Sequence, residues 1–353
     1  MDYSPLISQI TSHFPQLEPK TNFILAPVTT LKIGGPADLY IHSTSNHQFE
    51  GLLRLLKLDS VNPTLIGNGS NILISDTGIK GITVHNTDTD TTITIHDRPQ
   101  SSSSTTLSTQ AIRHEDNPQD YLDFTKIDYD ESTSPPIQVT ITSGTPLPFA
   151  LNYLLNHGVT GLQWFAYIPG TIGGATYYNI HGGNYHFNQF LNSITYFDFK
   201  TGETITTPAS DLKWDYDTSE FQAHPEWIIL EATFNLFQGD VDRAKRTAAA
   251  WISQKSKVQP MNSAGSVFQN PTLKQCLPIW GEQKSTGWII DQVLGLKGLT
   301  VGGAQIGPQH ANIFTNLGGA TAADFMALID KVRTEAKSKL NLDLKLEIKL
   351  LGF

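Results

Sequence analysis

A stretch of glycines and small polar residues, 167–185, constrains the fold of this chain more than any other segment. It reads Y-I-P-G-T-I-G-G-A-T-Y-Y-N-I-H-G-G-N-Y. Pro169 suits the entry to a helix, because its φ is fixed and it has no N–H to lose. Gly170, Gly173 and Gly174 lack a Cβ, so a ligand can approach the backbone there. The N–H groups and dipole of a helix start favour an anion, and the alternative is a tight turn with close helix packing.

A second loop of the same kind lies upstream at 67–71 and reads G-N-G-S-N. The short apolar runs 64–66 and 72–74 on either side predict two strands. Glycines that alternate with Asn and Ser let successive N–H groups point into one concavity that binds anions. Two such loops suggest a diphosphate held from two sides. Neither loop fits the Walker pattern G-x-x-x-x-G-K-[ST], and neither fits the Rossmann pattern G-x-G-x-x-G. Walker-type and ordinary Rossmann nucleotide sites are therefore not expected.

Both loops resemble those of a known family. G-N-G-S-N-I-L-I-S-D and I-P-G-T-I-G-G-A are similar to the two FAD-pyrophosphate loops of the UDP-N-acetylenolpyruvoylglucosamine reductase (MurB) family. Upstream, T-T-L-K-I-G-G-P-A-D at 29–38 resembles its flavin-contacting N-terminal segment. Downstream, G-S-V-F-Q-N-P, G-W-I-I-D-Q, L-K-G-L-T-V-G-G-A-Q and H-A-N-I-F-T-N resemble its substrate-domain signatures. The motifs follow the family's order and cover most of the chain, apart from one long insertion.

The resemblance implies an α+β fold in two parts. A two-loop (PCMH-type) FAD-binding domain would occupy 1–238, and an α+β substrate-binding domain would occupy 239–353. The implied cofactors are FAD and NADPH. The residues implied to contact the flavin cofactor are Ile33, Gly34, Gly35, Gly67, Asn68, Gly69, Ser70, Asn71, Pro169, Gly170, Thr171, Gly173, Gly174 and Ala175.

The resemblance also implies a catalytic set. Ser266, in A-G-S-V-F, matches the family's proton donor, although taken alone it is typical of a turn serine. It has no G-x-S-x-G surroundings, so a hydrolase nucleophile is not expected. Glu347, in L-E-I-K, matches the catalytic glutamate, although by alternation alone it would be a solvent-facing strand residue. The UDP-sugar contacts implied by position are Tyr178, Lys257, Asn270 and Gln292, while the role of His181 is open.

One catalytic position departs from the family pattern F-G-Y-R-D-S-x-F. The corresponding segment reads W-D-Y-D-T-S-E-F, so Asp217 occupies the place of an arginine that helps to hold the substrate carboxylate. At about 4 Å and an effective dielectric constant of about 20, like charges repel by about 4 kcal/mol. Either another cation, Lys213 or Lys349, faces the substrate, or the oxidative half-reaction is weak.

The resemblance therefore implies that NADPH reduces bound FAD, which then reduces UDP-N-acetylglucosamine enolpyruvate to UDP-N-acetylmuramate, a peptidoglycan precursor. Two alternatives remain open. One is a flavin oxidase or dehydrogenase of the wider two-loop FAD superfamily, which the downstream motifs disfavour. The other is a diverged flavin-binding protein without turnover, for which Asp217 is the best argument.

Composition excludes several other classes. The net charge of −9 argues against general nucleic-acid binding. No apolar run approaches the roughly 20 residues that span a bilayer, and no secretory signal pattern is seen. Cys276 is the only cysteine, so no intrachain disulfide or CxxC site exists, and no cluster has zinc-ligand spacing. The expectations are a cytoplasmic protein without metal, with the oligomeric state open and a monomer favoured.

Periodicity predicts the main elements, with a domain boundary near 239–240. A segment at 87–136, rich in Ser, Thr and Asp and containing S-S-S-S-T-T, predicts a solvated insertion with a hairpin near 92–96. The predicted helices cover 5–14, 46–58, 147–156, 241–257 and 322–340. The predicted strands cover 39–41, 64–66, 72–74, 82–85, 137–141, 194–199, 203–206, 227–237 and 342–350.

Overall fold

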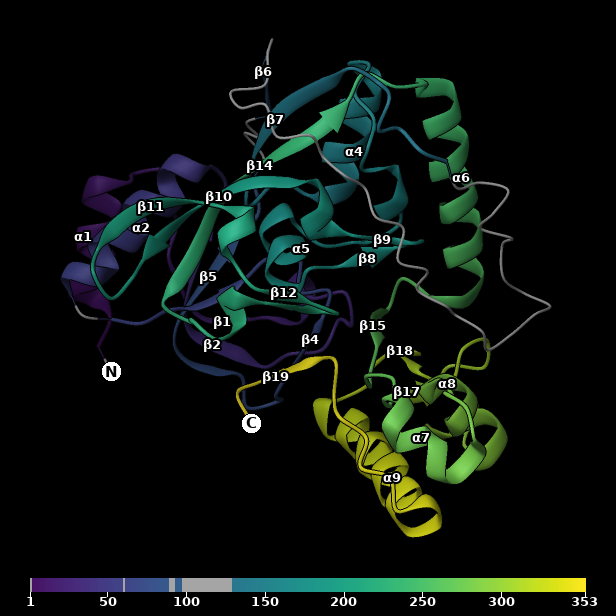
Figure 1. Ribbon diagram of the computed structural model, residues 1–353. Coiled ribbons are helices and arrows are strands. Elements are labelled where there is room, and N and C mark those ends of the chain that lie inside the picture. Colours follow the sequence, from purple (N-terminus) through teal and green to yellow (C-terminus); the bar gives the residue numbers. More distant parts are fainter. Residues whose placement is uncertain (1, 60, 89–92, 97–128) are drawn as a thin grey trace.

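The computed structural model describes residues 2–59, 61–88, 93–96 and 129–353. Two sheets with their helices form the upper part of the molecule in Figure 1, and a smaller layer containing the C-terminal helix lies beneath them. Most of the predicted insertion falls outside the described residues. Among the described helices, none combines the length and apolar character needed to cross a membrane.

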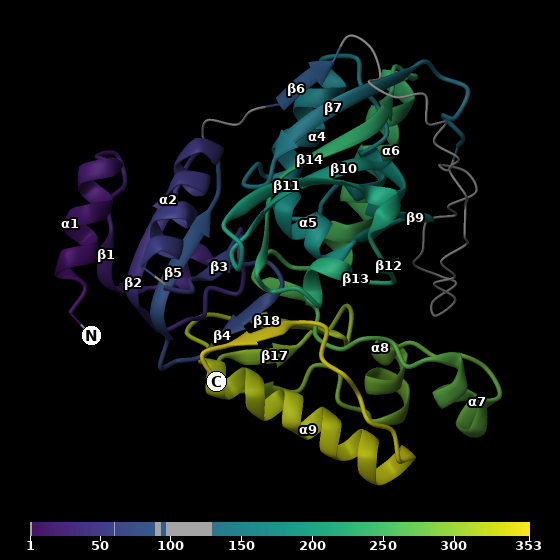
Figure 2. The same ribbon diagram turned by 60° about the vertical axis from the view of Figure 1, so that its left-hand side comes forward.

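The N-terminal sheet has four strands with two helices beside it (Figure 2). Helix α2 (Asn46–Leu58) starts at Ser45, whose side chain accepts the Gln48 N–H, and its apolar face buries Phe49 against the sheet. Helix α1 (Ser4–His13) adds Ile10 to the same core. The strands in spatial order are β1 (Lys20–Ile24), β2 (Pro36–Ser43), β5 (Ile79–Asn86) and β3 (Thr64–Ile66).

The central sheet is antiparallel throughout and carries the largest core. Helix α4 (Leu147–Asn156), α5 (Ile172–Tyr178) and α6 (Val241–Val258) contribute buried side chains to that core. Because α6 belongs to this core, it packs with the elements before the predicted boundary at 239–240; that boundary stays a prediction. The strands in spatial order are β11 (Glu203–Pro208), β10 (Leu191–Asp198), β14 (Trp227–Phe237), β7 (Pro136–Thr142) and β6 (Ile93–His96).

The C-terminal layer places the long helix α9 (Ala322–Leu340) against a small antiparallel sheet. A capping box between Thr321 and Asp324 starts α9, and Asn341 ends it at φ 52°. Buried residues of α9 such as Phe325 and Val332 fill the core beneath the sheet. The other elements of this layer are β15 (Ser263–Ser266), β18 (Ile313–Asn316), β17 (Ala304–Ile306), β16 (Thr300–Val301), α7 (Leu273–Trp280) and α8 (Thr286–Trp288).

The C-terminal layer is tied to the N-terminal region at several points. Strand β19 (Lys349–Leu351) pairs in parallel with β4 (Ile72–Ile74), directly after the first glycine loop. Asp76 accepts the N–H groups of Ala322 (2.7 Å) and Ala323 (3.0 Å) and so caps the start of α9 from another part of the chain. These contacts fix the C-terminal layer relative to the N-terminal region. Residues of both line the cavity described below.

Most predicted elements are confirmed, and one is wrong in extent. The strand predicted at 342–350 is reduced to β19, Lys349–Leu351. Burial does alternate along the preceding residues, with Leu342, Leu344 and Ile348 buried. Of the described residues, however, only Phe268 forms a bridge with that segment, at Leu346, because β4 is three residues long and offers no further partner. Of the predicted hairpin at 92–96, strand β6 is present and pairs with β7; Thr92 lies outside the described residues.

Candidate active site

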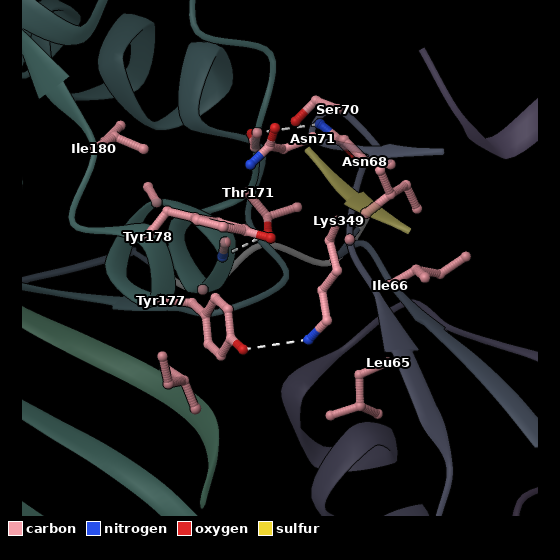
Figure 3. Close-up of a pocket in the computed structure, with 18 of the residues that line it drawn as sticks. Leu65, Ile66, Asn68, Ser70, Asn71, Thr171, Tyr177, Tyr178, Ile180 and Lys349 are labelled. Carbon is pink, nitrogen blue, oxygen red and sulfur yellow. Dashed lines mark hydrogen bonds between the residues drawn. The ribbon is translucent and has the colours of Figure 1, made fainter. Parts of the chain in front are cut away.

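A cavity of about 820 Å³ runs between the glycine loops and the C-terminal layer. Its volume is in the upper range for small-molecule sites. One part is apolar and includes Leu65, Ile66 and Trp227, and another contains charged side chains of α6 and the C-terminal segment. Figure 3 shows Leu65, Ile66, Tyr177, Tyr178 and Lys349 around this space.

The two glycine loops meet at one end of the cavity. Asn68 Nδ2 donates to the carbonyl oxygen of Pro169 at 2.7 Å, which joins the first loop to the second (Figure 3). A Cβ on Gly67 would come within 2.8 Å of Thr171 Oγ1, so only glycine allows this approach. Thr171 in turn accepts the Gly174 N–H at 3.2 Å and caps α5.

The first loop also contacts the segment that carries Glu347. Asn71 Nδ2 donates to the Glu347 carbonyl oxygen at 3.5 Å, and the Lys349 N–H donates to the Asn71 carbonyl oxygen at 3.0 Å. The Glu347 N–H donates to the Val267 carbonyl oxygen at 2.9 Å, next to Ser266 in β15. The cavity is therefore lined by the first loop, Ser266 and Glu347 together.

Asp217 reaches the cavity from the turn between β12 (Trp214–Asp215) and β13 (Thr218–Ser219). Its φ of +50° is a left-handed conformation that Asp tolerates better than most residues. Asp217 Oδ1 lies 2.9 Å from Nδ1 of His181, which belongs to β8 (His181–Gly182) and stacks on Tyr216 with ring centroids 4.8 Å apart. Asp217 Oδ2 is buried and has no hydrogen-bond partner in the described structure.

Charge and burial perturb two further groups of the cavity. Burial raises the pKa of Glu347 well above its ordinary value, the negative charge of Asp217 raises it further, and Lys255 opposes both. Burial lowers the pKa of the Lys255 ammonium group, and Glu347 opposes that shift. Lys255 forms neither a hydrogen bond nor an ion pair with any described residue, so it is a cation inside the cavity without a short-range partner.

Comparison with known proteins identifies the family. A family model for the C-terminal domain of UDP-N-acetylenolpyruvoylglucosamine reductase matches residues 256–351. The UDP-N-acetylenolpyruvoylglucosamine reductase of Nostoc sp. strain PCC 7120 is 31% identical over 339 residues, which cover 95% of this chain and 87% of the relative. The chain belongs to the UDP-N-acetylenolpyruvoylglucosamine reductase family. The reductase of Clostridium botulinum strain 657 is 29% identical over 326 residues, 92% of this chain and 89% of that one.

The fold agrees with this assignment. The crystal structure of UDP-N-acetylenolpyruvylglucosamine reductase from Thermus caldophilus superimposes with a TM-score of 0.66 and 23% identity, over 96% of this chain and 99% of that one. The family resemblance and the α+β fold class predicted from the sequence are thus confirmed.

The structure brings together most of the flavin-contacting residues that the family resemblance implies. The exceptions are Ile33, Gly34 and Gly35, which do not line the cavity. Ile33 is buried in the C-terminal core, Gly34 packs against Leu25, Ala26 and Ile74, and Gly35 packs against the segment after β4. The same N-terminal segment contacts the first glycine loop, since the Thr30 N–H donates to the Gly69 carbonyl oxygen at 3.2 Å. The predicted residues that line the cavity are Gly67, Asn68, Gly69, Ser70, Asn71, Pro169, Gly170, Thr171, Gly173, Gly174 and Ala175.

Of the substrate contacts implied by the family, Tyr178 lines the cavity and three residues do not. Lys257 is exposed on α6, and Gln292 is exposed in the C-terminal layer. Asn270 Oδ1 accepts the Thr286 N–H at 2.9 Å and so organises a turn. Within the described structure these three residues lie outside the cavity, so their predicted role has no geometric support.

The two lysines considered as substitutes for the family arginine differ in position. Lys213 is 91% exposed, lies 4.0 Å from a Glu220 oxygen and does not line the cavity. Lys349 lines the cavity and donates to the Tyr177 hydroxyl at 3.4 Å (Figure 3).

Sequence reasoning missed Lys255, although the helical pattern carries a signal for it. Ala244, Ala248 and Trp251 form the buried face of α6, and Lys255 follows Trp251 by four residues on that same face. Lys257, the lysine that the motif predicts, lies two residues further along α6, is exposed and does not line the cavity. No group of three or more metal-ligating side chains was found in the residues that the structure describes.

Proposed function

We propose that this chain is an FAD-dependent reductase that uses NADPH to convert UDP-N-acetylglucosamine enolpyruvate to UDP-N-acetylmuramate for peptidoglycan synthesis. One observation carries the proposal: both glycine loops, Ser266 and Glu347 line a single cavity. The two relatives described above, which are UDP-N-acetylenolpyruvoylglucosamine reductases and align with nearly the whole chain, support it. The cytoplasmic location and the monomeric state stay predictions.

The cavity fits the diphosphate of FAD at the junction of the loops. Gly170 and Gly174 line it, and a Cβ on either would reach no closer than 3.5 Å to its nearest neighbour, so open space lies where a side chain would project. Backbone N–H groups at such a place favour phosphate oxygens. The side chains of Asn68, Ser70 and Thr171 border the same space. When bound, FAD would take a hydride from NADPH and supply it to the enolpyruvyl double bond.

The residues at the charged end of the cavity would then supply a proton to the substrate and stabilise its negative charge. Ser266 donates a proton to the carbon that bears the carboxylate and regains one from water. Glu347 stabilises the intermediate. Lys255 and Lys349 provide positive charge for the anionic groups of the substrate, and Lys255 acts more strongly because it is less solvated.

An anaerobic stopped-flow experiment separates the two half-reactions. NADPH should bleach the bound flavin, and the enolpyruvyl sugar should restore its colour with formation of UDP-N-acetylmuramate. A protein whose flavin is bleached by NADPH but not reoxidised by the sugar would disprove the assigned substrate. A protein without flavin would disprove the proposal altogether.

A second candidate is a flavin-binding protein without turnover, and Asp217 is the observation that favours it. An acidic side chain stands where the family pattern has a cation. NADPH that fails to bleach a yellow purified protein would support this reading. Reduction by a simple alcohol followed by reoxidation with oxygen would instead indicate an oxidase.

A further inference from the structure

Two carboxyl groups, Asp217 and Glu347, line the same cavity but differ in their partners. Asp217 Oδ1 accepts a hydrogen bond from the His181 ring at 2.9 Å. The Glu347 side chain forms no ion pair and no hydrogen bond with any residue that the structure describes, although its backbone is held on both sides. The two groups come from segments far apart in the sequence, and their meeting depends on the C-terminal layer.

Two neighbouring carboxyl groups in a poorly solvated site do not both ionise readily, and the proton resides on the one that has less support for its charge. The His181 N–H supports the charge at Asp217, while Glu347 has no donor of its own. Burial and the charge of Asp217 raise the pKa of Glu347 in agreement with this. The proton is therefore assigned to Glu347.

We propose that Asp217, held by His181, is a positioning residue that keeps Glu347 in its neutral acid form, so that Glu347 donates a hydrogen bond to the substrate carboxylate. The inference rests on the proposed function, because it takes the enolpyruvyl carboxylate as the ligand. The inference gives the acidic residue at position 217 a role different from that of the family arginine. Asp217 does not replace the arginine as a ligand; it converts its neighbour into a neutral donor, and Lys255 and Lys349 remain the cations that line the cavity.

Other charged and titratable groups face Glu347 from each packed element. Lys255 on α6 opposes the neutral form, and its charge is available to the substrate. Tyr178 on α5 and Tyr216 beside the turn both have pKa values raised by burial, so they remain neutral donors at physiological pH. Lys349 follows Glu347 by two residues, and the hairpin of β8 and β9 (Tyr185–His186) carries His181 and His186 on the side of Asp217. The charge of Asp215 in β12 acts on His186, whereas the charges that shift the pKa of Glu347 are those of Asp217 and Lys255.

The test is the pH dependence of ligand affinity, measured by calorimetry on the purified full chain with its bound flavin. UDP-N-acetylmuramate carries the carboxylate, and UDP-N-acetylglucosamine lacks it. For the wild type, affinity for the first ligand should fall at alkaline pH as Glu347 loses its proton, and affinity for the second should not follow the same curve. Wild-type curves that coincide for both ligands would overturn the inference.

Asp217→Asn keeps the shape and the acceptor for His181 but removes the charge. Without that charge Glu347 loses its proton more easily, so the alkaline loss of affinity should move to lower pH by about one unit or more. Asp215→Asn is the matched control, because it removes a charge from the same turn at a residue that does not line the cavity. Equal curves for Asp217→Asn and Asp215→Asn would overturn the inference.

Glu347→Gln supplies a permanent neutral donor. It should keep affinity for UDP-N-acetylmuramate within a few-fold of the wild type and abolish the alkaline loss, whereas Glu347→Ala should lose affinity about tenfold or more. If Glu347→Gln binds as weakly as Glu347→Ala, a neutral hydrogen-bond donor at this position does not account for the affinity, and the inference fails alone. A wild type that binds neither UDP-sugar overturns the proposed function and the inference together.

Discussion

The glycine-loop end and the charged end of the cavity differ in the groups that they offer to a ligand. At the loop end, the proposed function relies on backbone N–H groups, and Gly67, Gly69 and Gly173 allow close packing against Thr171, Val28 and Ser143. At the charged end, recognition depends on the side chains of Asp217, Glu347 and Lys255. A backbone site needs particular glycines at particular places, so its motif is retained. A side-chain site can take its charged groups from different residues, and here the motif departs from the family pattern at Asp217.

The largest expected effect is at the loop end, with Gly69→Ala. Gly69 has a φ of +59°, and a Cβ there would lie 2.7 Å from the Val28 carbonyl oxygen, so the loop must move. We expect flavin affinity to fall by about tenfold or more, measured as flavin content after gel filtration. Gly81→Ala is the matched control, since Gly81 has a φ of +84° but no atom within 4 Å of the added Cβ. Equal flavin content in the two variants would remove the loop from the cofactor site.

Ser266→Ala tests the chemistry at the charged end. Reduction of the flavin by NADPH should stay near the wild-type rate, while reoxidation by the enolpyruvyl sugar should slow by about 10²–10⁴-fold, as expected for loss of a general acid. Ser266→Cys should be milder, because a thiol also donates a proton. The readout is single-turnover stopped-flow, and Ser256→Ala on the exposed side of α6 serves as the control. Reoxidation of Ser266→Ala at the wild-type rate would show that Ser266 is a structural turn residue.

Lys255→Met tests whether Lys255 supplies the positive charge that the arginine supplies in the family pattern. Loss of a charged hydrogen-bond donor should weaken binding of UDP-N-acetylmuramate by about 10- to 100-fold, with a smaller effect on UDP-N-acetylglucosamine. Lys257→Met, on the same helix but outside the cavity, should change neither affinity. Lys349→Met should have an intermediate effect, because its side chain is more exposed. A larger effect from Lys257 than from Lys255 would restore the motif-based assignment.

The smallest expected effect concerns stability and Glu347. Its pKa is raised in the folded state, so the stability that its proton contributes is complete below the unfolded pKa and is lost as pH rises through the folded value. Glu347→Gln should therefore match the wild type near pH 4 and exceed its melting temperature by no more than a few degrees near pH 8. Thermal denaturation at both pH values measures this. A Glu347→Gln variant that is less stable at pH 8 would indicate an ionised, favourably paired Glu347.

Much of the fold was predictable because it depends on local patterns. The helices at 46–58, 147–156 and 322–340 and the strand at 227–237 have the predicted bounds, since periodicity and capping residues mark their ends. Both glycine loops were found in the same way, because the geometry they require is encoded within a few consecutive residues. The last strand was overestimated, because alternation reports burial but not whether a partner strand exists.

The charged end depended on contacts between distant residues. His181 and Asp217 are 36 positions apart, and their hydrogen bond gives Asp217 a partner that no local motif indicates. Lys255 lies in the cavity and Lys257 lies outside it because of how α6 packs, and Asn270 and Gln292 lie outside the cavity in the C-terminal layer. The sequence alone determined which backbone segments form a ligand loop, since that information is local. Only the tertiary structure decided which side chains share the cavity, because their ionisation and roles depend on neighbours brought together by folding.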